Sequence, residues 1–422
     1  MEIILGSAVL GLAAFFTATV PFRPTIAVVL FLGMYPIEQI LFRVFGVFFS
    51  GSAFNYFIGG VVVLATVVSL LRSGIPKIAV GMLLLILMIL VLTSLSLYWT
   101  SAPRAGGFAV SHYLVEAGSA TALGLLVIRG VESVRYIWLS LVALAFLISV
   151  FLIVCGVPSI GGRTALLEGG TVLSPAKIIG LGVIACFVPS RAFSPLSANG
   201  RLIMGGTMLL ALFLLGTRGQ LIFALLSSLI GAWYAGAFTV VTKQAFITAI
   251  LMVVGLLAYG FEPVLQIDKI SGAASRFEAG TVDYAFGSRW ESLVSCLTLD
   301  APIFGHGVMS WAYETTGADV YLYPHNSLAQ AFFEIGLVGL FLFLTIFLYP
   351  LVRSFSLRRS VADTPLHSSS VAILLSFLTY DFLLSLKEGT FMSCLVLYFS
   401  AAALTTLVVS LGARRKRAIS IA

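Results

Sequence analysis

Long apolar runs recur from one end of this sequence to the other, and they constrain its fold more than any other feature. Many of them reach about 18 residues or more with few charges, which is enough to cross a bilayer. Hydrophobic residues make up 60% and charged residues only 10% of the 422 residues, and the mean hydropathy is +1.10. Charged residues normally form about a quarter of a soluble chain, which disfavours a soluble all-α protein with a very apolar core. The sequence predicts an all-α polytopic membrane protein.

Thirteen candidate spans can be marked by comparison with the crossing length. They cover residues 3–20, 25–46, 53–71, 78–98, 108–128, 134–154, 172–189, 202–216, 219–236, 244–260, 328–351, 370–386 and 390–411. Because 202–216 and 219–236 are short and nearly fused, we predict about 12–13 transmembrane helices. The first run contains Glu2 and lacks a basic segment before it, which favours a retained helix over a cleaved signal peptide. Without an internal repeat, we expect one membrane domain over residues 1–422.

Basic residues alternate along the chain with the predicted spans. Fifteen of the 24 Lys and Arg fall in connections on one side: Arg23, Arg72, Lys77, Arg129, Arg135, Arg191, Arg201, Lys243, Arg353, Arg358, Arg359, Arg414, Arg415, Lys416 and Arg417. The acidic residues there are only Glu132 and Asp363. This pattern follows the positive-inside rule. The net charge of +7 therefore reports membrane topology and not nucleic-acid binding, and the loop 261–327 is predicted to lie on the outer face of the membrane.

The large loop 261–327 contains most of the polar chemistry. It holds eight of the 17 acidic residues and two of the four histidines, His306 and His325. Ser288 and Glu291 match a capping box. Apolar residues then recur at helical spacing, at Trp290, Leu293, Val294 and Leu297. We therefore expect a short amphipathic helix on the membrane surface.

Arginines at the predicted outer ends of spans are candidates for binding an anionic substrate. Charged groups near a membrane core are costly and are often functional. Arg218, in Gly216-Thr217-Arg218-Gly219, has small neighbours that would let a ligand approach. The other outer-face candidates are Arg276, Arg289, Arg163 and Arg104. The planar guanidinium suits a diphosphate because it donates two parallel hydrogen bonds. The alternative is an arginine that snorkels to the interface or pairs with an acidic loop residue.

Among the histidines, His325 is the candidate general base, because imidazole exchanges a proton near neutral pH. The alternative is a loop or capping residue. His306 has glycines on both sides and is predicted to lie in a turn, whereas His112 and His367 show no indication of a role. If Glu334 shared a helix with His325, nine residues would place the two side chains on opposite faces. We therefore expect Glu334 to be a buried partner for an arginine or a polar helix contact.

Asn326 or Ser327 can cap the helix that starts with the next apolar run. Lys387 and Asp381 lie near the last outer turn and could join the site, although a solvated turn is the expected environment. The four cysteines, at positions 155, 186, 296 and 394, predict neither a disulfide framework nor a metal site. The sequence also lacks a Walker loop, a dinucleotide-binding fingerprint and a nucleophile elbow. We therefore expect no metal and no cofactor.

Six short motifs, taken in their order, resemble those of the O-antigen ligase and O-antigen polymerase superfamily. They are Tyr98-Trp99-Thr100-Ser101-Ala102-Pro103, Gly216-Thr217-Arg218-Gly219, Arg289-Trp290, Pro302-Ile303-Phe304-Gly305-His306-Gly307, His325-Asn326-Ser327-Leu328 and Glu334-Ile335-Gly336-Leu337-Val338-Gly339. Thr217 stands where the family has serine. The resemblance is carried by motifs over residues 216–340 and by architecture elsewhere.

The resemblance implies a metal-independent glycosyltransferase on the periplasmic face of a bacterial inner membrane. Its donor would be a glycan on undecaprenyl diphosphate. The acceptor would be a lipid A-core sugar in a ligase, or another lipid-linked repeat in a polymerase. Arg218 and Arg289 match arginines that hold the diphosphate, and His325 matches an essential histidine, as a base or as a phosphate-orienting group. Direct attack at the anomeric carbon would invert its configuration. The predicted catalytic residues are His325, Arg218 and Arg289, and the predicted substrate-binding residues are Arg276, Arg163, Arg104, Asn326 and Glu334.

Two other classes of function compete with glycan transfer. A transporter or lipid flippase would be expected to carry ionisable residues along a midplane pathway and repeated halves. A structural subunit of an envelope complex would need no catalytic histidine. The crowding of charges on one face favours the enzyme, and the sequence does not separate ligase from polymerase.

Overall fold

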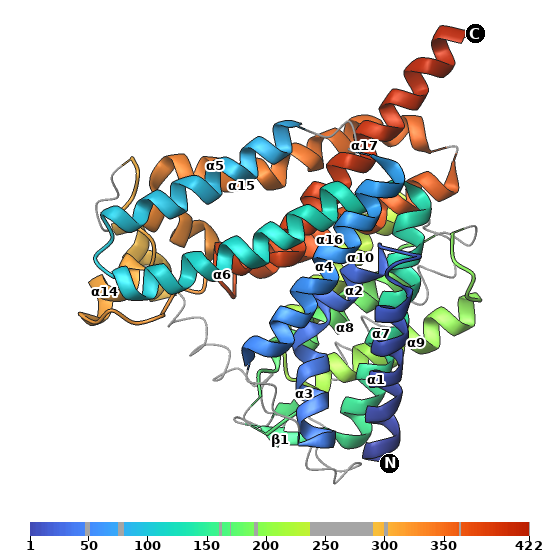
Figure 1. The fold of residues 1–422 in the computed structure, drawn as a ribbon, viewed down its shortest axis with the longest axis horizontal. Coiled ribbons are helices and arrows are strands. Elements are labelled where there is room, and N and C mark those ends of the chain that lie inside the picture. Colours follow the sequence, from blue (N-terminus) through green and yellow to red (C-terminus); the bar gives the residue numbers. More distant parts are fainter. Residues whose placement is uncertain are drawn as a thin grey trace. The chain divides into compact units, whose positions relative to one another are not determined.

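The computed structural model describes residues 1–46, 51–74, 80–159, 163–168, 170–189, 193–236, 290–298, 303–362 and 364–421. Most of this part of the chain is helical, which confirms the all-α fold class (Figure 1). The strands it contains form one antiparallel hairpin between β1 (Val157–Ser159) and β2 (Arg163–Ala165). Strands of three residues are too short for an alternating apolar pattern to predict them.

The chain forms two compact units that are interleaved along the sequence. The first comprises Met1–Arg72, Gly130–Asp283 and Arg358–Ser376, and the second comprises Ser73–Arg129, Tyr284–Leu357 and Phe377–Ala422. The single membrane domain over residues 1–422 stays a prediction.

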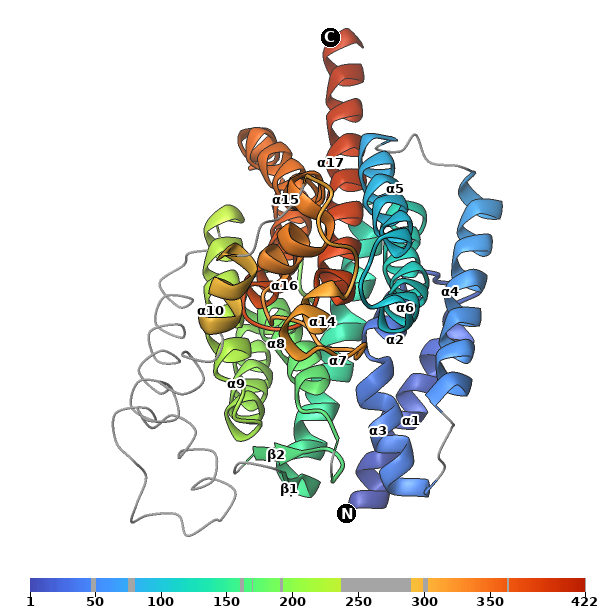
Figure 2. The same ribbon diagram turned by 90° about the vertical axis from the view of Figure 1, so that its left-hand side faces the viewer.

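The first unit is built around one buried helix, α8. Its helices are α1 (Glu2–Thr19), α2 (Ile26–Leu32), α3 (Met34–Phe45), α4 (Gly51–Ser73, up to Arg72), α7 (Val131–Cys155), α8 (Leu173–Phe187), α9 (Ala198–Leu214) and α10 (Arg218–Tyr234). Helix α8 contacts α7, α9 and α10, between which it lies in Figure 2. From Pro175 onward almost all of its side chains are buried. A helix that is apolar on all sides is expected to occupy such a central position.

The second unit contains the segment with His325. Its elements are α5 (Val80–Leu95), η1 (Ser96–Tyr98), α6 (Pro103–Ala122) with its π-helical extension η2 (Leu123–Val127), a helix over residues 290–298, α14 (Ser310–Thr316), α15 (Ser327–Val361, up to Leu357), η3 (Phe391–Ser393) and α17 (Leu395–Ile421). Helix α16 (Pro365–Ser385) passes from the first unit into the second after Ser376. Helices α5 and α6 run side by side, and α17 contacts both (Figure 1).

Eight helices of the described chain are long and apolar enough to cross a membrane, and a bent pair would make a ninth. The pair is α2 and α3, which meet at an angle of 65°. Helices α8 and α9 are apolar but shorter, and the predicted span 244–260 lies outside the described residues. The prediction of 12–13 transmembrane helices is therefore not tested for the whole chain.

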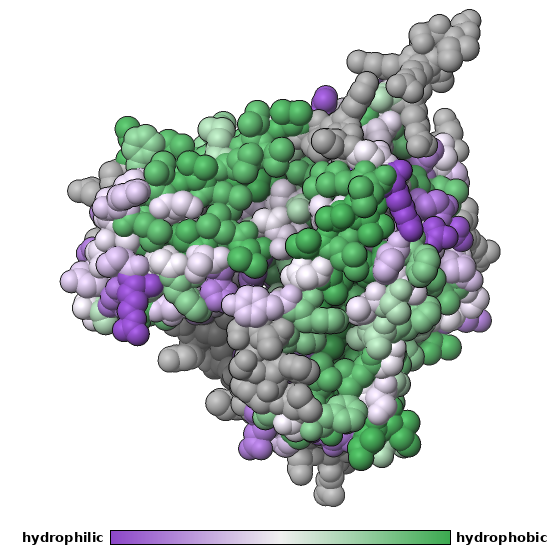
Figure 3. Space-filling view, viewed as in Figure 1, coloured by the Kyte–Doolittle hydropathy of each residue, from purple (hydrophilic) through white to green (hydrophobic). Residues whose placement is uncertain are grey.

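Apolar side chains cover the outer faces of several long helices. Figure 3 shows such residues gathered over α5 and over α4. The exposed apolar side chains of α5 are Val80, Leu84, Leu87, Met88, Val91 and Leu95. Exposed apolar patches of this extent are found where a protein meets a membrane or a partner, which agrees with a polytopic membrane protein.

Candidate active site around His325

Helix α15 is interrupted at Gly336, and the turn over residues 303–307 docks onto the interruption. The backbone of Gly336 has φ 73° and ψ −169°, far from helical values. Three main-chain hydrogen bonds connect the turn to the helix: His306 N–H to Phe333 O at 3.0 Å, Gly307 N–H to Glu334 O at 2.8 Å, and Val338 N–H to Ile303 O at 3.4 Å. The groups released by the interruption are therefore satisfied by the turn, as buried backbone polar groups require.

Glycines make this close backbone approach possible. Gly305 and Gly336 both have positive φ, 71° and 73°, which L side chains rarely adopt. A Cβ atom on Gly305 would collide with the main chain of Glu334, and one on Gly336 would collide with the carbonyl of Ile303. Gly305 and Gly336 belong to two different sequence motifs, and the contact between the turn and α15 requires glycine at both positions. His306 lies in the turn, as predicted, and its ring stacks on Phe333 at 4.6 Å.

A third motif holds the other side of the turn. The Thr100 hydroxyl donates to Val308 O at 2.6 Å, and Val308 N–H donates to the Ser96 hydroxyl at 3.1 Å. Gly307 again has positive φ, 97°, and a Cβ there would meet the main chain of Thr100. Three motifs far apart in sequence thus form one substructure within the second unit.

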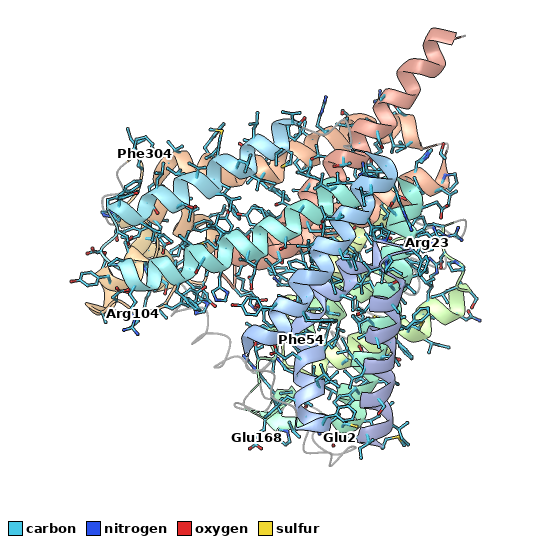
Figure 4. All side chains as sticks on the ribbon, viewed as in Figure 1. Glu2, Arg23, Phe54, Arg104, Glu168 and Phe304 are labelled. Carbon is cyan, nitrogen blue, oxygen red and sulfur yellow. The ribbon has the colours of Figure 1, made fainter. Side chains whose placement is uncertain are left out.

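Asp319 ties the following segment to the start of α6. Its carboxylate accepts from Arg104 N–H at 2.9 Å and from Ala105 N–H at 2.8 Å. These donors belong to the first turn, where the helix itself offers no partners and a negative charge is favoured. The Arg104 side chain is exposed, and Figure 4 places Arg104 and Phe304 at the same end of the second unit.

His325 is exposed and adopts a left-handed backbone conformation, with φ 55°. This conformation is uncommon outside glycine and often marks a functional position. The next residue, Asn326, caps α15 as predicted: its Oδ1 accepts from Leu328 N–H at 3.1 Å and Ala329 N–H at 3.0 Å. The Tyr323 ring meets the His325 ring edge to face at 4.8 Å.

Asn326 also links the start of α15 to the turn that follows α16. Asn326 Nδ2 donates to Leu386 O at 3.1 Å, so both ends of the amide contact the backbone. Its predicted substrate contact stays a prediction. Beyond it, Lys387 Nζ lies 3.6 Å from Glu388 Oε2.

The sequence predicts that Asp381 lies in a solvated turn, and this prediction is wrong. Asp381 is buried, and its carboxylate accepts a hydrogen bond from Leu397 N–H at 2.8 Å. That contact satisfies a donor in the first turn of α17, a role for a carboxylate that a sequence pattern does not reveal.

Glu334 and Gln330 form a buried pair in α15. Gln330 Nε2 donates to Glu334 Oε2 at 3.1 Å, while Phe391 N–H donates to Gln330 Oε1 at 3.3 Å. The Glu334 carboxylate also accepts a hydrogen bond from the backbone of Met309. Glu334 is therefore the predicted polar helix contact, and its role in substrate binding stays a prediction. Gln330 was not among the predicted residues, although its i,i+4 spacing to Glu334 is the signal that could have identified it.

Residues 290–298 form a helix, as predicted, although the capping residue Ser288 lies outside the described residues. Of the predicted apolar face, Trp290 and Leu297 are exposed. Leu293 packs against a buried cluster formed by Cys296, Trp311, Ala329 and Phe333. Trp311 Nε1 donates to the Ser295 hydroxyl at 3.0 Å. The helix is thus held against α14 and α15, and its position on the membrane surface stays a prediction.

The predicted arginines are distributed over both units. Arg218 is half-buried at the start of α10, two residues after Gly216, whose φ is 62°. Arg163 begins β2, also in the first unit, whereas Arg104 belongs to the second. Arg276 and Arg289 lie outside the described residues. In the part of the chain that is described, groups of three or more His, Cys, Asp or Glu suited to a metal ion do not occur.

Loss of the Asn326 cap is expected to affect both stability and activity. Asn326→Ala should lower the free energy of unfolding by about 1–2 kcal/mol, because a cap and a buried contact are lost. It should also reduce the rate of the glycan transfer that the sequence motifs imply, because His325 is the adjacent residue. Asn326→Asp retains the capping oxygen but loses the donor to Leu386 O, so an intermediate effect is expected. Thermal unfolding in detergent and initial transfer rates measure both quantities.

The matched control for this prediction is Ser197→Ala. The Ser197 hydroxyl caps α9 in the first unit by accepting from Gly200 N–H at 3.1 Å. Its loss should cost a similar stability while leaving transfer unchanged. Equal loss of transfer in both variants would contradict a specific role of Asn326 at the site.

Comparison with known proteins gives a family match over part of the chain. Residues 203–344 match the model of a family described as O-Antigen ligase. The search of curated proteins found no match. The matched segment contains Arg218, the docked turn, His325 and Gly336, and the Thr100 segment hydrogen-bonds to Val308 within it. Similarity to the O-antigen ligase family therefore extends over residues 203–344.

Proposed function

We propose that this protein is a glycosyltransferase of the periplasmic face of the bacterial inner membrane. It would transfer a glycan from undecaprenyl diphosphate to a sugar hydroxyl, either on a lipid A-core or on another lipid-linked repeat. The observation that supports this most is the docking of three family motifs in the unit that presents His325. Fixed geometry of this kind is what positioning of a catalytic group requires.

In the proposed reaction, the acceptor hydroxyl oxygen attacks the anomeric carbon of the donor sugar. The bond between that carbon and the phosphate oxygen breaks, and undecaprenyl diphosphate leaves with the electron pair. The acceptor proton goes to His325, and a single displacement inverts the anomeric configuration. General-base assistance of this type contributes about 10²–10⁴-fold. An exposed imidazole with fixed neighbours, as at His325, suits that role.

Negative charge grows on the diphosphate as it leaves, so fixed cations would stabilise the transition state. The assignment of Arg218 and Arg289 to the diphosphate comes from the resemblance of their motifs. The further proposed substrate contacts are Arg104, Arg163, Arg276, Asn326 and Glu334. No metal takes part in the proposed reaction.

The test is a transfer assay with purified protein in lipid nanodiscs, the organism's own lipid-linked glycan and its candidate acceptors. A covalent product with inverted anomeric configuration, formed in the presence of a metal chelator, is expected. The acceptor that is consumed identifies the enzyme as a ligase or a polymerase. If reconstituted liposomes instead move intact lipid-linked glycan across the bilayer without forming product, the protein is a flippase and the proposal is wrong.

Substitution of Arg218 tests the diphosphate assignment. Arg218→Ala should lower kcat/KM for transfer by about 10²–10³-fold, the loss typical of one group that stabilises transition-state charge. Arg218→Lys keeps the charge but not the two parallel hydrogen bonds, so partial activity is expected. Arg135→Ala is the control, since that side chain lies in α7 with Glu132 at 4.0 Å. A wild-type kcat/KM in Arg218→Ala would remove Arg218 from the reaction.

A further inference from the structure

Five aromatic rings form a continuous file in the second unit, and the file ends at His325. Neighbouring ring centroids lie 4.4 Å apart for His112 and Phe108, 5.6 Å for Phe108 and Tyr321, 6.1 Å for Tyr321 and Tyr323, and 4.8 Å for Tyr323 and His325. The first two rings belong to α6, and the others belong to the segment that precedes α15. The sequence indicated no role for His112, and it does not reveal the file because the two segments are distant in the chain.

The file is accessible although it is held in place. Phe108 is 55% exposed, Tyr321 is 46% exposed, and His325 is exposed as well. The Asp319 carboxylate fixes the segment before Tyr321 to the start of α6, and Thr390 hydrogen-bonds the Tyr321 side chain. Partial burial raises the pKa of Tyr321 to about 12, so its hydroxyl is uncharged at neutral pH and can donate a hydrogen bond. A rigid and accessible row of rings is suited to ligand binding.

Polar groups along the file indicate what kind of ligand it meets. His112 lies nine residues into the candidate span Pro103–Val127, a depth of about 13 Å along the helix. Its side chain is nevertheless 48% exposed and lies 3.9 Å from the Glu116 carboxylate. Ionisable side chains within a membrane span are costly in contact with lipid and mark substrate pathways. Four of the five rings also carry a nitrogen or a hydroxyl, which a surface for an isoprenoid tail would not need.

We propose that this file binds the sugar rings of the glycan substrate and aligns them toward His325. The inference rests on the proposed function, and it names the part of the substrate that the rings contact. Sugar rings present C–H groups that pack on aromatic faces, and their hydroxyls can bond to the phenol and imidazole groups. Because stacking depends little on the identity of each sugar, the file would set the orientation and reach of the glycan more than its sequence.

The test measures binding and transfer separately in four variants. Phe108→Leu and Tyr321→Leu remove a ring but keep an apolar side chain, whereas Tyr321→Phe keeps the ring. Phe341→Leu is the control, since Phe341 is a 68% exposed aromatic residue of the same unit outside the file. The first probe is the soluble oligosaccharide released by mild acid from the organism's own lipid-linked glycan. The second probe is undecaprenyl diphosphate without sugar.

Each leucine substitution within the file should raise the oligosaccharide Kd by about 2- to 12-fold, the range that corresponds to ~0.5–1.5 kcal/mol for an aromatic contact. Tyr321→Phe should raise it less, Phe341→Leu should leave it unchanged, and affinity for undecaprenyl diphosphate should be unchanged in all four. Saturation-transfer NMR should show the sugar protons in contact with aromatic side chains. Unchanged oligosaccharide binding in both file variants would overturn the inference. A parallel loss of affinity for undecaprenyl diphosphate would also overturn the inference, because the rings would then hold the lipid tail.

The His325→Ala protein separates this inference from the proposed function. Its transfer should fall by about 10²–10⁴-fold, whereas its oligosaccharide Kd should rise by no more than the 2- to 12-fold expected for the loss of one ring. Ring-dependent binding in a protein that never forms product would sustain the inference and defeat the proposed function. Glycan transfer by a protein whose oligosaccharide Kd is unchanged by the ring substitutions would support the proposed function and defeat the inference.

Discussion

Replacement of His325 by alanine is expected to lower the kcat of glycan transfer by about 10²–10⁴-fold, the contribution of a general base. In the proposed reaction, the acceptor hydroxyl would lose the group that takes its proton, while the other contacts that hold the sugar and the lipid would stay in place. KM should therefore change little. The measurement is single-turnover transfer by purified protein with saturating lipid-linked glycan.

A second substitution at the same position serves as the control for correct folding. His325 has a φ of 55°, and asparagine tolerates the left-handed region better than alanine does. His325→Asn should therefore match the wild-type thermal midpoint and remain as inactive as His325→Ala. His367→Ala, at a half-buried histidine of α16 in the first unit, should retain full transfer. Normal transfer by either His325 variant would falsify the assignment of a base.

Gly336→Ala is expected to have the largest effect on stability. Its φ and ψ, 73° and −169°, fall in a region that is essentially restricted to glycine, and the added methyl group would meet the carbonyl of Ile303. Strain and overpacking together should lower the free energy of unfolding by about 2–4 kcal/mol. The docked turn over residues 303–307 should separate from α15, so transfer should fall with stability. Urea unfolding followed by tryptophan fluorescence measures the first quantity.

The matched control is Gly118→Ala in α6, where a new Cβ has open space around it. Within a helix this change should be neutral or stabilising by about 0.5–1 kcal/mol, because alanine has less backbone entropy to lose. If Gly336→Ala were as stable as Gly118→Ala, the interruption in α15 would not depend on glycine.

Local patterns accounted for the features that depend on neighbouring residues. The all-α class follows from the length of the apolar runs, because a bilayer selects for length and composition. The Asn326 cap and the helix over residues 290–298 follow from residues within one or two turns of each other. The order of the motifs likewise indicated the family that residues 203–344 match. None of these features requires knowledge of which distant segments meet.

Sequence patterns were thus enough to predict the fold class, the family that residues 203–344 match and the residues that merit attention. The tertiary structure alone decided which of them meet: Thr100 with Val308, 208 residues away, and Asp319 with Arg104 N–H, 215 residues away. It also decided that Asp381 is buried and that five rings form a file ending at His325. The physical reason is that hydrophobic periodicity is a local property. A cap, a glycine contact or a ring pair between distant segments depends on how helices pack, which no local pattern encodes.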